Sequence, residues 1–329
     1  METIGTWWMW AGFFAFVLVM LLIDLLAVGG AKAHRVSLRE AAVWSAVWVG
    51  VSLAFAGLLW CYLDHAMGRE VADAKTLAFV TGYLIEKALA VDNVFVWLIL
   101  FGYFAIDPAL QKRVLALGVF GAIVMRSAMI FGGVWLINQF HWLLYVFGAF
   151  LLLTGIKMWR AADEAPDLAD NALLAWLRRR LNVTDRLHGE RFVVTQMRDG
   201  KAVRFVTPLL LVLVLVEISD LIFAVDSIPA IFAVSLDPFI VLTSNVFAIL
   251  GLRAMYFLLA GMAERFSLLK YGLAIVLVFV GGKMLLMDVF HVPVLFSLGV
   301  VAAIIVTSVV LSLRRTARQA PTDGWRDEC

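Results

Sequence analysis

The sequence predicts an all-α polytopic membrane protein with about nine transmembrane helices. Its 329 residues are 63% hydrophobic and 16% charged, and the mean hydropathy is +0.94, whereas soluble domains are only about 45–50% apolar. The apolar residues are gathered in runs of about 20, the length that crosses a hydrocarbon core of about 30 Å. These runs lie at 7–28, 40–63, 76–103, 114–137, 142–160, 207–233, 239–261, 268–290 and 294–313.

The first run is expected to be a retained helix rather than a signal peptide. It begins Met1-Glu2-Thr3, without a basic residue, and it is longer than the apolar core of a signal peptide. The net charge of +2 is too small to indicate a nucleic-acid partner. Cys61 lies in a predicted span and Cys329 is the last residue, so neither a disulfide framework nor a thiolate metal site is expected.

Lys and Arg residues are concentrated in the loops after the first, third, fifth and seventh runs and in the tail. Because basic loops face the cytoplasm, we expect the N-terminus outside and the C-terminus in the cytoplasm. The richest loop, 161–206, is too short for a domain and is expected to be a cytoplasmic connector. Within it, alternating residues around Asp199-Gly200 predict a β-hairpin over 192–206.

An internal repeat relates the third to fifth runs to the sixth to eighth. Three helices separate the two copies, an odd number, so the copies cross the membrane in opposite directions. Such a 3+3 inverted repeat is common in transporters. A duplicated scaffold is the alternative, but a scaffold does not need buried acids in both copies. The matching residues are Asp92 with Asp226, Arg126 with Arg253 and Lys157 with Lys283, at offsets of 134, 127 and 126 (226 − 92, 253 − 126 and 283 − 157).

The repeat divides the chain into six parts. In transporters of this kind the substrate lies at mid-membrane, where the first helices of the two repeats meet. The parts are two N-terminal helices with their loops (1–75), the first three-helix repeat (76–160), the cytoplasmic loop (161–206), the second repeat (207–290), the last helix (291–313) and a cytoplasmic tail (314–329).

Acidic side chains lie inside the predicted spans, although a charge at the bilayer centre costs a few kcal/mol or more. They are Asp24, Glu86, Asp92, Glu217, Asp220 and Asp226, and the buried bases expected to compensate them are Lys87, Arg126, Arg253 and Lys283. Six acids against four bases leave a formal charge near −2, which suits one divalent cation or two protons. The arginines are expected to be counter-ions, the lysines could equally tie helices together, and Asp24 could only bond a neighbouring helix. Lys157 is expected to reach the cytoplasmic rim.

The ligand atoms near these acids are oxygens. Asn93 and Ser227 follow the two repeated aspartates, and no His or Cys lies near the acidic cores. Oxygen-rich sites suit Mg, Ca and Mn. Pro229 is expected to break its helix beside Asp226, because proline lacks an N–H and clashes with the carbonyl of Val225. The freed carbonyl would then be available to a cation.

Three strings of the sequence resemble the TerC family of membrane proteins. They are Leu84-Ile-Glu86-Lys-Ala-Leu-Ala-Val-Asp92-Asn-Val-Phe-Val, Glu217-Ile-Ser-Asp220-Leu-Ile-Phe-Ala-Val-Asp226-Ser-Ile-Pro229 and Asn245-Val-Phe-Ala-Ile-Leu-Gly-Leu-Arg253. The resemblance spans nearly the whole chain and indicates the Alx-like branch, found in the bacterial inner (cytoplasmic) membrane. It implies a manganese exporter that protects the cytoplasm from excess Mn(II). By the same resemblance, the metal-associated positions are Glu86, Asp92, Glu217, Asp220 and Asp226, with a weaker assignment for Asp24.

The expected function is transport rather than catalysis. Mn(II) would leave the cytoplasm by alternating access in exchange for protons, and no tightly bound cofactor is expected. The lipid bilayer is the other expected partner, and the oligomeric state is left open. Two other classes remain: a membrane redox modulator or a metal- or pH-stress sensor without transport, and an intramembrane aspartyl hydrolase using Asp92 and Asp226. The sequence lacks the Cys pair, haem ligand pair and nucleotide fingerprint that a redox role would suggest.

Overall fold

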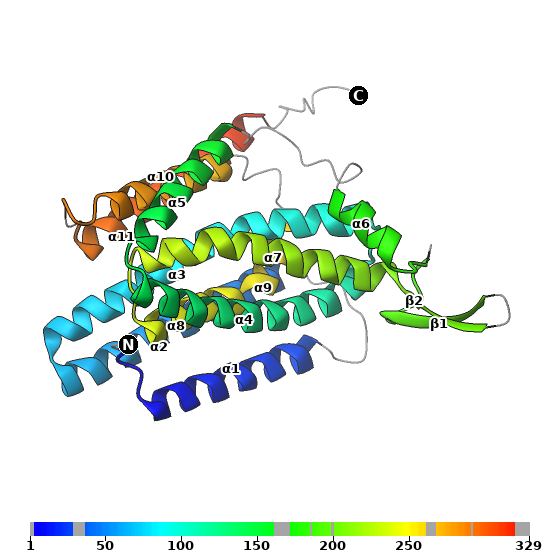
Figure 1. The fold of residues 1–329 in the computed structure, drawn as a ribbon, viewed down its shortest axis with the longest axis horizontal. Coiled ribbons are helices and arrows are strands. Elements are labelled where there is room, and N and C mark those ends of the chain that lie inside the picture. The colour runs from blue at the N-terminus through cyan, green and yellow to red at the C-terminus, as the bar shows by residue number, and fades with distance from the viewer. Residues whose placement is uncertain are drawn as a thin grey trace, which may run out of the picture.

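The computed structural model describes residues 3–28, 37–160, 172–184, 186–198, 201–260, 268–290 and 292–319, and it is a bundle of long helices (Figure 1). Each predicted apolar run is helical in the described residues, and the seventh is divided at Gly251. The corresponding helices are α1 (Trp7–Val28), α2 (Leu38–Met67), α3 (Arg69–Tyr103), α4 (Pro108–Gln139), α5 (Leu143–Arg160), α7 (Pro208–Phe232), α8 (Pro238–Leu250) with α9 (Leu252–Ala260), α10 (Leu269–Leu285) and α11 (Val294–Gln319).

Six helical segments of the described chain are long and apolar enough to cross a membrane: α2, α4, α5, α7, α8 with α9, and α11 up to Ser312. Helix α1 contributes a shorter described apolar stretch, Trp7–Ile23. Helix α3 carries Glu86, Lys87 and Asp92 in its middle. The prediction of a polytopic helical membrane protein is therefore confirmed, while the count of nine crossings stays a prediction.

Helix α8 lies at the centre of the bundle. All of its residues from Pro238 to Leu250 are buried, and it contacts α1, α2, α3 and α4. Helices α5, α10 and α11 form a group on one side, which contacts the remaining helices through α3, α4 and α7 (Figure 1). Helix α1 lies at the opposite edge and packs on α4 and α8.

The helices that the repeat relates lie against each other. Helices α3 and α7 are in contact and run in opposite directions in Figure 1, and α5 packs on α10. Glycines bring the α5 and α10 backbones close together, as is common between membrane helices. A Cβ added at Gly281 of α10 would lie only 2.7 Å from the carbonyl oxygen of Gly148 in α5. This arrangement supports the inverted repeat, which stays a prediction.

Helices α4 and α8, which the repeat also relates, begin in the same way. Each starts with proline after an aspartate cap, and the carboxylate accepts the N–H two residues on: Asp107 from Ala109 at 2.8 Å and Asp237 from Phe239 at 3.1 Å. Proline is favoured in the first helical turn because its missing N–H would have no partner there. The offset of 130 (237 − 107) lies between the offset of 134 for Asp92 and Asp226 and that of 127 for Arg126 and Arg253.

Asp237 also ties the beginning of the chain to the bundle. Its carboxylate accepts hydrogen bonds from the Thr3 hydroxyl at 2.8 Å, the Ile4 amide at 3.1 Å and the Lys75 ammonium group at 2.9 Å. The Asp237 side chain is only 1% exposed. One buried carboxylate therefore joins the segment before α1, the first turns of α3 and the start of α8.

The predicted helix break at Pro229 is wrong. Helix α7 continues through Pro229 to Phe232. The proline lies close to the end of the helix, where the turns before it keep their own hydrogen bonds and only the carbonyl four residues earlier loses its partner. The turn after it is also bonded, since the Ala233 amide donates to the Pro229 carbonyl at 3.1 Å. Val225 is 44% exposed and does not line the cavity described below.

The loop after α5 contains two small elements. Helix α6 (Ala172–Arg180) was not predicted. Strands β1 (Val193–Arg198) and β2 (Lys201–Val206) pair antiparallel with Arg198 opposite Lys201, so the predicted hairpin is confirmed. The turn residues Asp199 and Gly200 lie outside the described residues.

Candidate functional site

The site is built around Arg126, in the middle of α4. Its guanidinium group is 1% exposed and pairs with two carboxylates from different helices. Asp220 of α7 accepts two parallel hydrogen bonds, from Nη2 to Oδ1 at 2.8 Å and from Nε to Oδ2 at 3.0 Å. Glu86 of α3 accepts a further hydrogen bond from Nη1. The planar fork of arginine suits such two-point contacts with a carboxylate.

Three neutral side chains complete this cluster. Asn93 of α3 donates to Oδ1 of Asp220 at 3.0 Å, and Asn245 of α8 donates to Oε2 of Glu86 at 3.1 Å. The hydroxyl oxygen of Ser227 accepts from Nη1 of Arg126 at 3.2 Å. We call Glu86, Asn93, Arg126, Asp220, Ser227 and Asn245 the Arg126 cluster. All six are nearly inaccessible, at 0–2% exposure.

Two pairs of residues in the Arg126 cluster have the spacing of the predicted repeat. Glu86 and Asp220 are separated by 134 residues (220 − 86), as are Asn93 and Ser227 (227 − 93), the same offset that relates the two repeated aspartates. Each of α3 and α7 thus supplies one carboxylate to Arg126, whereas Ser227 accepts from the arginine and Asn93 donates to Asp220. The four hydrogen bonds of Arg126 offset part of the penalty of burying these charges in a low-dielectric interior.

Two amide oxygens of the cluster have no hydrogen-bond partner among the described residues. They are Oδ1 of Asn93 and Oδ1 of Asn245, and both are buried. Buried polar atoms are normally bonded, so each is an available acceptor. With the two carboxylates they form an oxygen-rich surround of the type that hard divalent cations prefer.

A cavity of about 250 Å³ adjoins the cluster. Glu86, Asn93, Arg126 and Ser227 line it on one side. Asp226 of α7 faces the same space, together with residues of α5 and α10. The lining residues outside the cluster are Leu89, Ala90, Thr154, Lys157, Met158, Phe223, Asp226 and Leu277. The cavity therefore holds a further carboxylate next to the paired ones.

Lys157 and Thr154 were missed as site residues by the sequence reasoning. Lys157 was expected at the cytoplasmic rim; it is exposed in the last turn of α5 and also lines the cavity together with Asp226. The repeat contained a usable signal, because Lys157 matches Lys283, which was included among the compensating bases. Asn245 lies in one of the family-like strings, but nothing in its spacing indicated a bond to Glu86.

Other predicted site residues lie apart from the cluster. Glu217 packs against Gly121 of α4, where its Oε1 would lie 2.1 Å from an added Cβ, and its buried Oε2 has no hydrogen-bond partner in the described structure. Lys87 donates to the Ala248 carbonyl at 3.2 Å and so ties α3 to α8. The side chains of Asp24 and Asp92 lie outside the described part of the structure.

The remaining compensating bases are not at the cavity either. Arg253 of α9 is 6% exposed and acts electrostatically on Lys112 of α4, as Glu40 of α2 does. Lys283 is half-buried on α10 and does not line the cavity. Although Arg253 matches Arg126 in the repeat, the two arginines have different surroundings.

The described side chains do not form a ready multi-carboxylate site. Within the described ranges, no group of three or more His, Cys, Asp or Glu side chains is placed to hold a metal ion. The guanidinium group of Arg126 occupies the position between Glu86 and Asp220 and uses three of their four carboxylate oxygens. A cation could bind both carboxylates only if Arg126 moved aside.

Known proteins resemble this chain along almost its whole length. A Salmonella typhi protein named Alx, a proposed membrane-bound redox modulator, is 59% identical over 312 residues, covering 95% of this chain and 96% of its own. An Escherichia coli K12 protein with the same name is 58% identical over the same shares. A Myxococcus xanthus membrane protein, STKORF319, is 46% identical and covers 98% of both chains.

The family comparison agrees with these relatives. No solved structure matches the chain. The sequence profile described as "Integral membrane protein TerC family" matches residues 71–320, which contain the Arg126 cluster and every residue that lines its cavity. Because the match covers most of the sequence and the relatives match it end to end, this chain belongs to the TerC family of integral membrane proteins.

Proposed function

We propose that this protein exports a divalent cation, Mn(II), across the bacterial inner membrane in exchange for protons. The observation that carries the proposal is the Arg126 cluster, in which buried carboxylates from two different helices adjoin a cavity that contains a third. Buried ionisable groups of this kind in membrane helices mark ion and proton pathways. The oxygen-only donor set favours Mn, Mg and Ca over Zn and Cu, and the choice of Mn(II) among them rests on the family resemblance.

In this mechanism Arg126 takes the place of the cation when no ion is bound. An entering Mn(II) would bind Glu86 and Asp220 with the free amide oxygens of Asn93 and Asn245, and the guanidinium group would withdraw. When the ion leaves, Arg126 would return and neutralise the carboxylates. Glu86 and Asp220 would always face a cation, so neither carboxylate would be left buried and unpaired, which is the costly state.

Proton exchange would supply the driving force. Moving a divalent cation outward against an inside-negative potential costs about 4.6 kcal/mol per 100 mV, twice the value for one charge. Two protons entering for each ion would cancel this electrical cost. Asp92 and Asp226 are the proposed carriers, with Asp24 and Glu217 as further candidates. Alternating access would follow from rocking of the two inverted repeats, with the N-terminus outside and nine crossings.

Flux measurements in proteoliposomes test this function. We expect purified protein to move Mn(II) when a pH gradient is imposed, and D220N to abolish the flux. The matched control is D64N, since Asp64 pairs with Arg69 at the exposed end of α2. Flux that is indifferent to the pH gradient would reject proton coupling, and full flux in D220N would reject the site. Competition by Ca(II) and Mg(II) measures selectivity.

The other classes predict different results. A redox modulator needs electron-carrying groups, and a thiol pair would require Cys61, which is free and exposed on α2, to act with Cys329, which lies outside the described residues. A C61S variant that keeps the redox response of the wild type would exclude that role. An intramembrane hydrolase need not be stabilised by Mn(II) against thermal unfolding in detergent. A sensor acting through the 161–206 loop would show no Mn(II) flux, and it would lose its response when that loop is deleted.

A further inference from the structure

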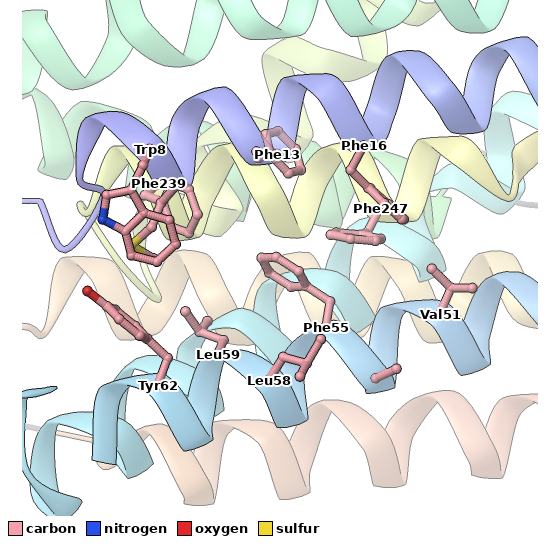
Figure 2. Close-up of a pocket in the computed structure, with 13 residues that line it drawn as sticks. Trp8, Phe13, Phe16, Val51, Phe55, Leu58, Leu59, Tyr62, Phe239 and Phe247 are labelled. Carbon is pink, nitrogen blue, oxygen red and sulfur yellow. The ribbon is translucent and has the colours of Figure 1, made fainter. Parts of the chain in front are cut away.

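A second, entirely different cavity lies between α1, α2 and α8 (Figure 2). It has a volume of about 480 Å³, within the roughly 300–1,000 Å³ of small-molecule pockets, and its walls are almost wholly apolar. Its floor is aromatic: the Phe247 ring of α8 lies 5.6 Å from that of Phe16 and 4.7 Å from that of Phe55. We call this cavity the α1–α2 groove. It shares no lining residue with the Arg126 cluster or its cavity.

The groove stays open because small residues line it where large ones would fill it. Gly12 of α1 faces the space, and a Cβ added there would have no heavy atom of the surrounding structure within 4 Å. Ala54 lines the opposite wall. At one end the rings of Trp8 and Tyr62 meet edge to face at 5.2 Å, so α1 and α2 are bridged there.

The mouth of the groove faces the bilayer. Leu58 and Trp8, which line it, are 71% and 47% exposed, and exposed apolar surface on the spans of a membrane protein meets lipid. The nitrogen and oxygen atoms of the lining side chains belong to Trp8 and Tyr62, which Figure 2 shows at the same end. Trp and Tyr are typical of the membrane–water boundary. The groove thus has one polar end and runs from it into the hydrocarbon.

Its dimensions match one lipid tail. From Val51 to Tyr62 it follows α2 for 11 residues (62 − 51), or about 16 Å at 1.5 Å per residue. One leaflet contributes about 15 Å of a 30 Å hydrocarbon core. Dividing the volume by this length gives a mean cross-section of about 30 Å². A helix about 10 Å across needs a cross-section of about 80 Å², which the groove does not provide. An extended hydrocarbon chain about 4–5 Å across at van der Waals contact needs only about 13–20 Å², which the groove can hold.

We propose that the α1–α2 groove binds one acyl chain of a bilayer phospholipid, with its headgroup beside Trp8 and Tyr62. Water gains little there, since an apolar cavity offers it few partners, and an empty groove would forfeit dispersion contacts along its length. The chain just beyond the end of α2 is polar: Arg69 is 66% exposed, pairs with Asp64 at 2.9 Å and stacks over Trp60 at 4.6 Å. The lipid would hold α1 to the bundle.

Photolabelling tests this proposal with a matched pair of variants. The protein is placed in bilayer nanodiscs that contain a phospholipid with a diazirine in one acyl chain, and labelled peptides are mapped by mass spectrometry after irradiation. G12L fills the groove. G57L is the control, because Gly57 of α2 has equally open space but does not line the groove. Labelling of the groove segments of α1 and α2 is expected to fall about tenfold in G12L, as when about two methylene groups lose their burial.

The outcomes are distinct from those of the transport assay. Equal labelling in G12L and G57L, or none in the wild type, would overturn the proposal. If G12L does not elute as a folded species, A54L fills the same space from α2 and must show the same loss. Mn(II) flux is not required for any of these results.

Discussion

Arg126 decides whether the centre of this protein can remain buried. Among the described residues, its guanidinium group is the cation that pairs with Glu86 and Asp220, and both carboxylates are inaccessible to solvent. Removing one partner of such a buried pair leaves the other charge uncompensated, which costs more than the pair itself contributes. The arginine is thus a requirement imposed by the two acids.

We expect Arg126→Leu to destabilise the protein by about 3–5 kcal/mol. Arg69→Leu is the control: its pair with Asp64 is exposed, and such pairs contribute less than about 1 kcal/mol. Thermal unfolding in detergent measures both. Equal shifts in the unfolding temperature of the two variants would show that the Arg126 pairs contribute no more to stability than an exposed ion pair. Arg126→Lys keeps the charge but loses the two-point contact with Asp220, so its stability should fall between the wild type and Arg126→Leu.

Gly121 and Glu217 form a second testable contact. An alanine at 121 would press on the Glu217 carboxylate, while Gly132, on the same helix, has open space around an added Cβ. We expect Gly132→Ala to be neutral or stabilising by up to about 1 kcal/mol. Gly121→Ala should lack that gain and recover it when combined with Glu217→Ala. A double-mutant cycle on unfolding should give a coupling of about 1 kcal/mol or more, and additive effects would contradict the contact.

The sequence indicated the charged residues of the centre but not their pairing. Glu86, Asp220 and Arg126 were recognised because charges are rare in apolar runs. Spacing along one helix fixes which residues share its face, yet it does not fix how that helix is rotated against its neighbours. Arg126 and Arg253 are therefore equivalent in the repeat, and only the structure distinguishes the cluster arginine from the one near Lys112.

At the level of helices, the contact between α5 and α10 depends on glycine. A Cβ at Gly281 would meet backbone atoms of α5, the Gly148 oxygen and the Leu152 nitrogen, both at 2.7 Å. Backbone in a packed helix cannot yield as a flexible side chain does. The adjacent Gly282 has open space around an added Cβ. Alanine can therefore be introduced at a crowded position, Gly281, and at an adjacent open position, Gly282.

We expect Gly281→Ala to destabilise the protein by about 1–3 kcal/mol through overpacking. Gly282→Ala should be neutral or slightly stabilising, because alanine favours the helix. Unfolding in detergent, followed by the loss of helical circular dichroism, measures both. A neutral Gly281→Ala would mean that α5 and α10 can separate without loss of stability.

Helix positions were predictable because a run of about 20 apolar residues has few alternatives in a bilayer. The positions at which helices are interrupted were harder to predict. Pro229 was expected to break α7 and does not, since it lies close to the helix end, where little backbone bonding depends on it. The seventh run is interrupted instead at Gly251, beside which the Lys87 ammonium group lies: a Cβ at Gly251 would be 2.5 Å from its nitrogen.

For the whole molecule, the basic loops give a testable orientation. We expect a green fluorescent protein fused after Gln319 to fluoresce, because it folds only on the cytoplasmic side. Alkaline phosphatase fused in the segment between α10 and α11 should be active, because it requires the periplasm. The reverse pattern at both positions would invert the orientation, and with it the proposed direction of transport.

The arrangement of helices in space was not predictable beyond the repeat. The predicted repeat indicated that α3 and α7 would meet, and the two helices are in contact. Nothing in the apolar runs showed that α8 would be buried on all sides, or that α1 would stand away from α2 at Gly12. Both follow from how side chains of different helices fit together, which a periodic pattern does not encode.

During biosynthesis, Thr3 and Ile4 leave the ribosome long before the residue that they bond. Thr3 and Ile4 bond Asp237, which follows them by 234 and 233 residues. At about 5–20 residues per second, α1 waits roughly 10–50 s in the membrane before its anchor is made. A helix can wait in lipid because its backbone hydrogen bonds are already satisfied. The bonds of the segment before α1 to Asp237 therefore form only after the central helix of the bundle has begun to emerge.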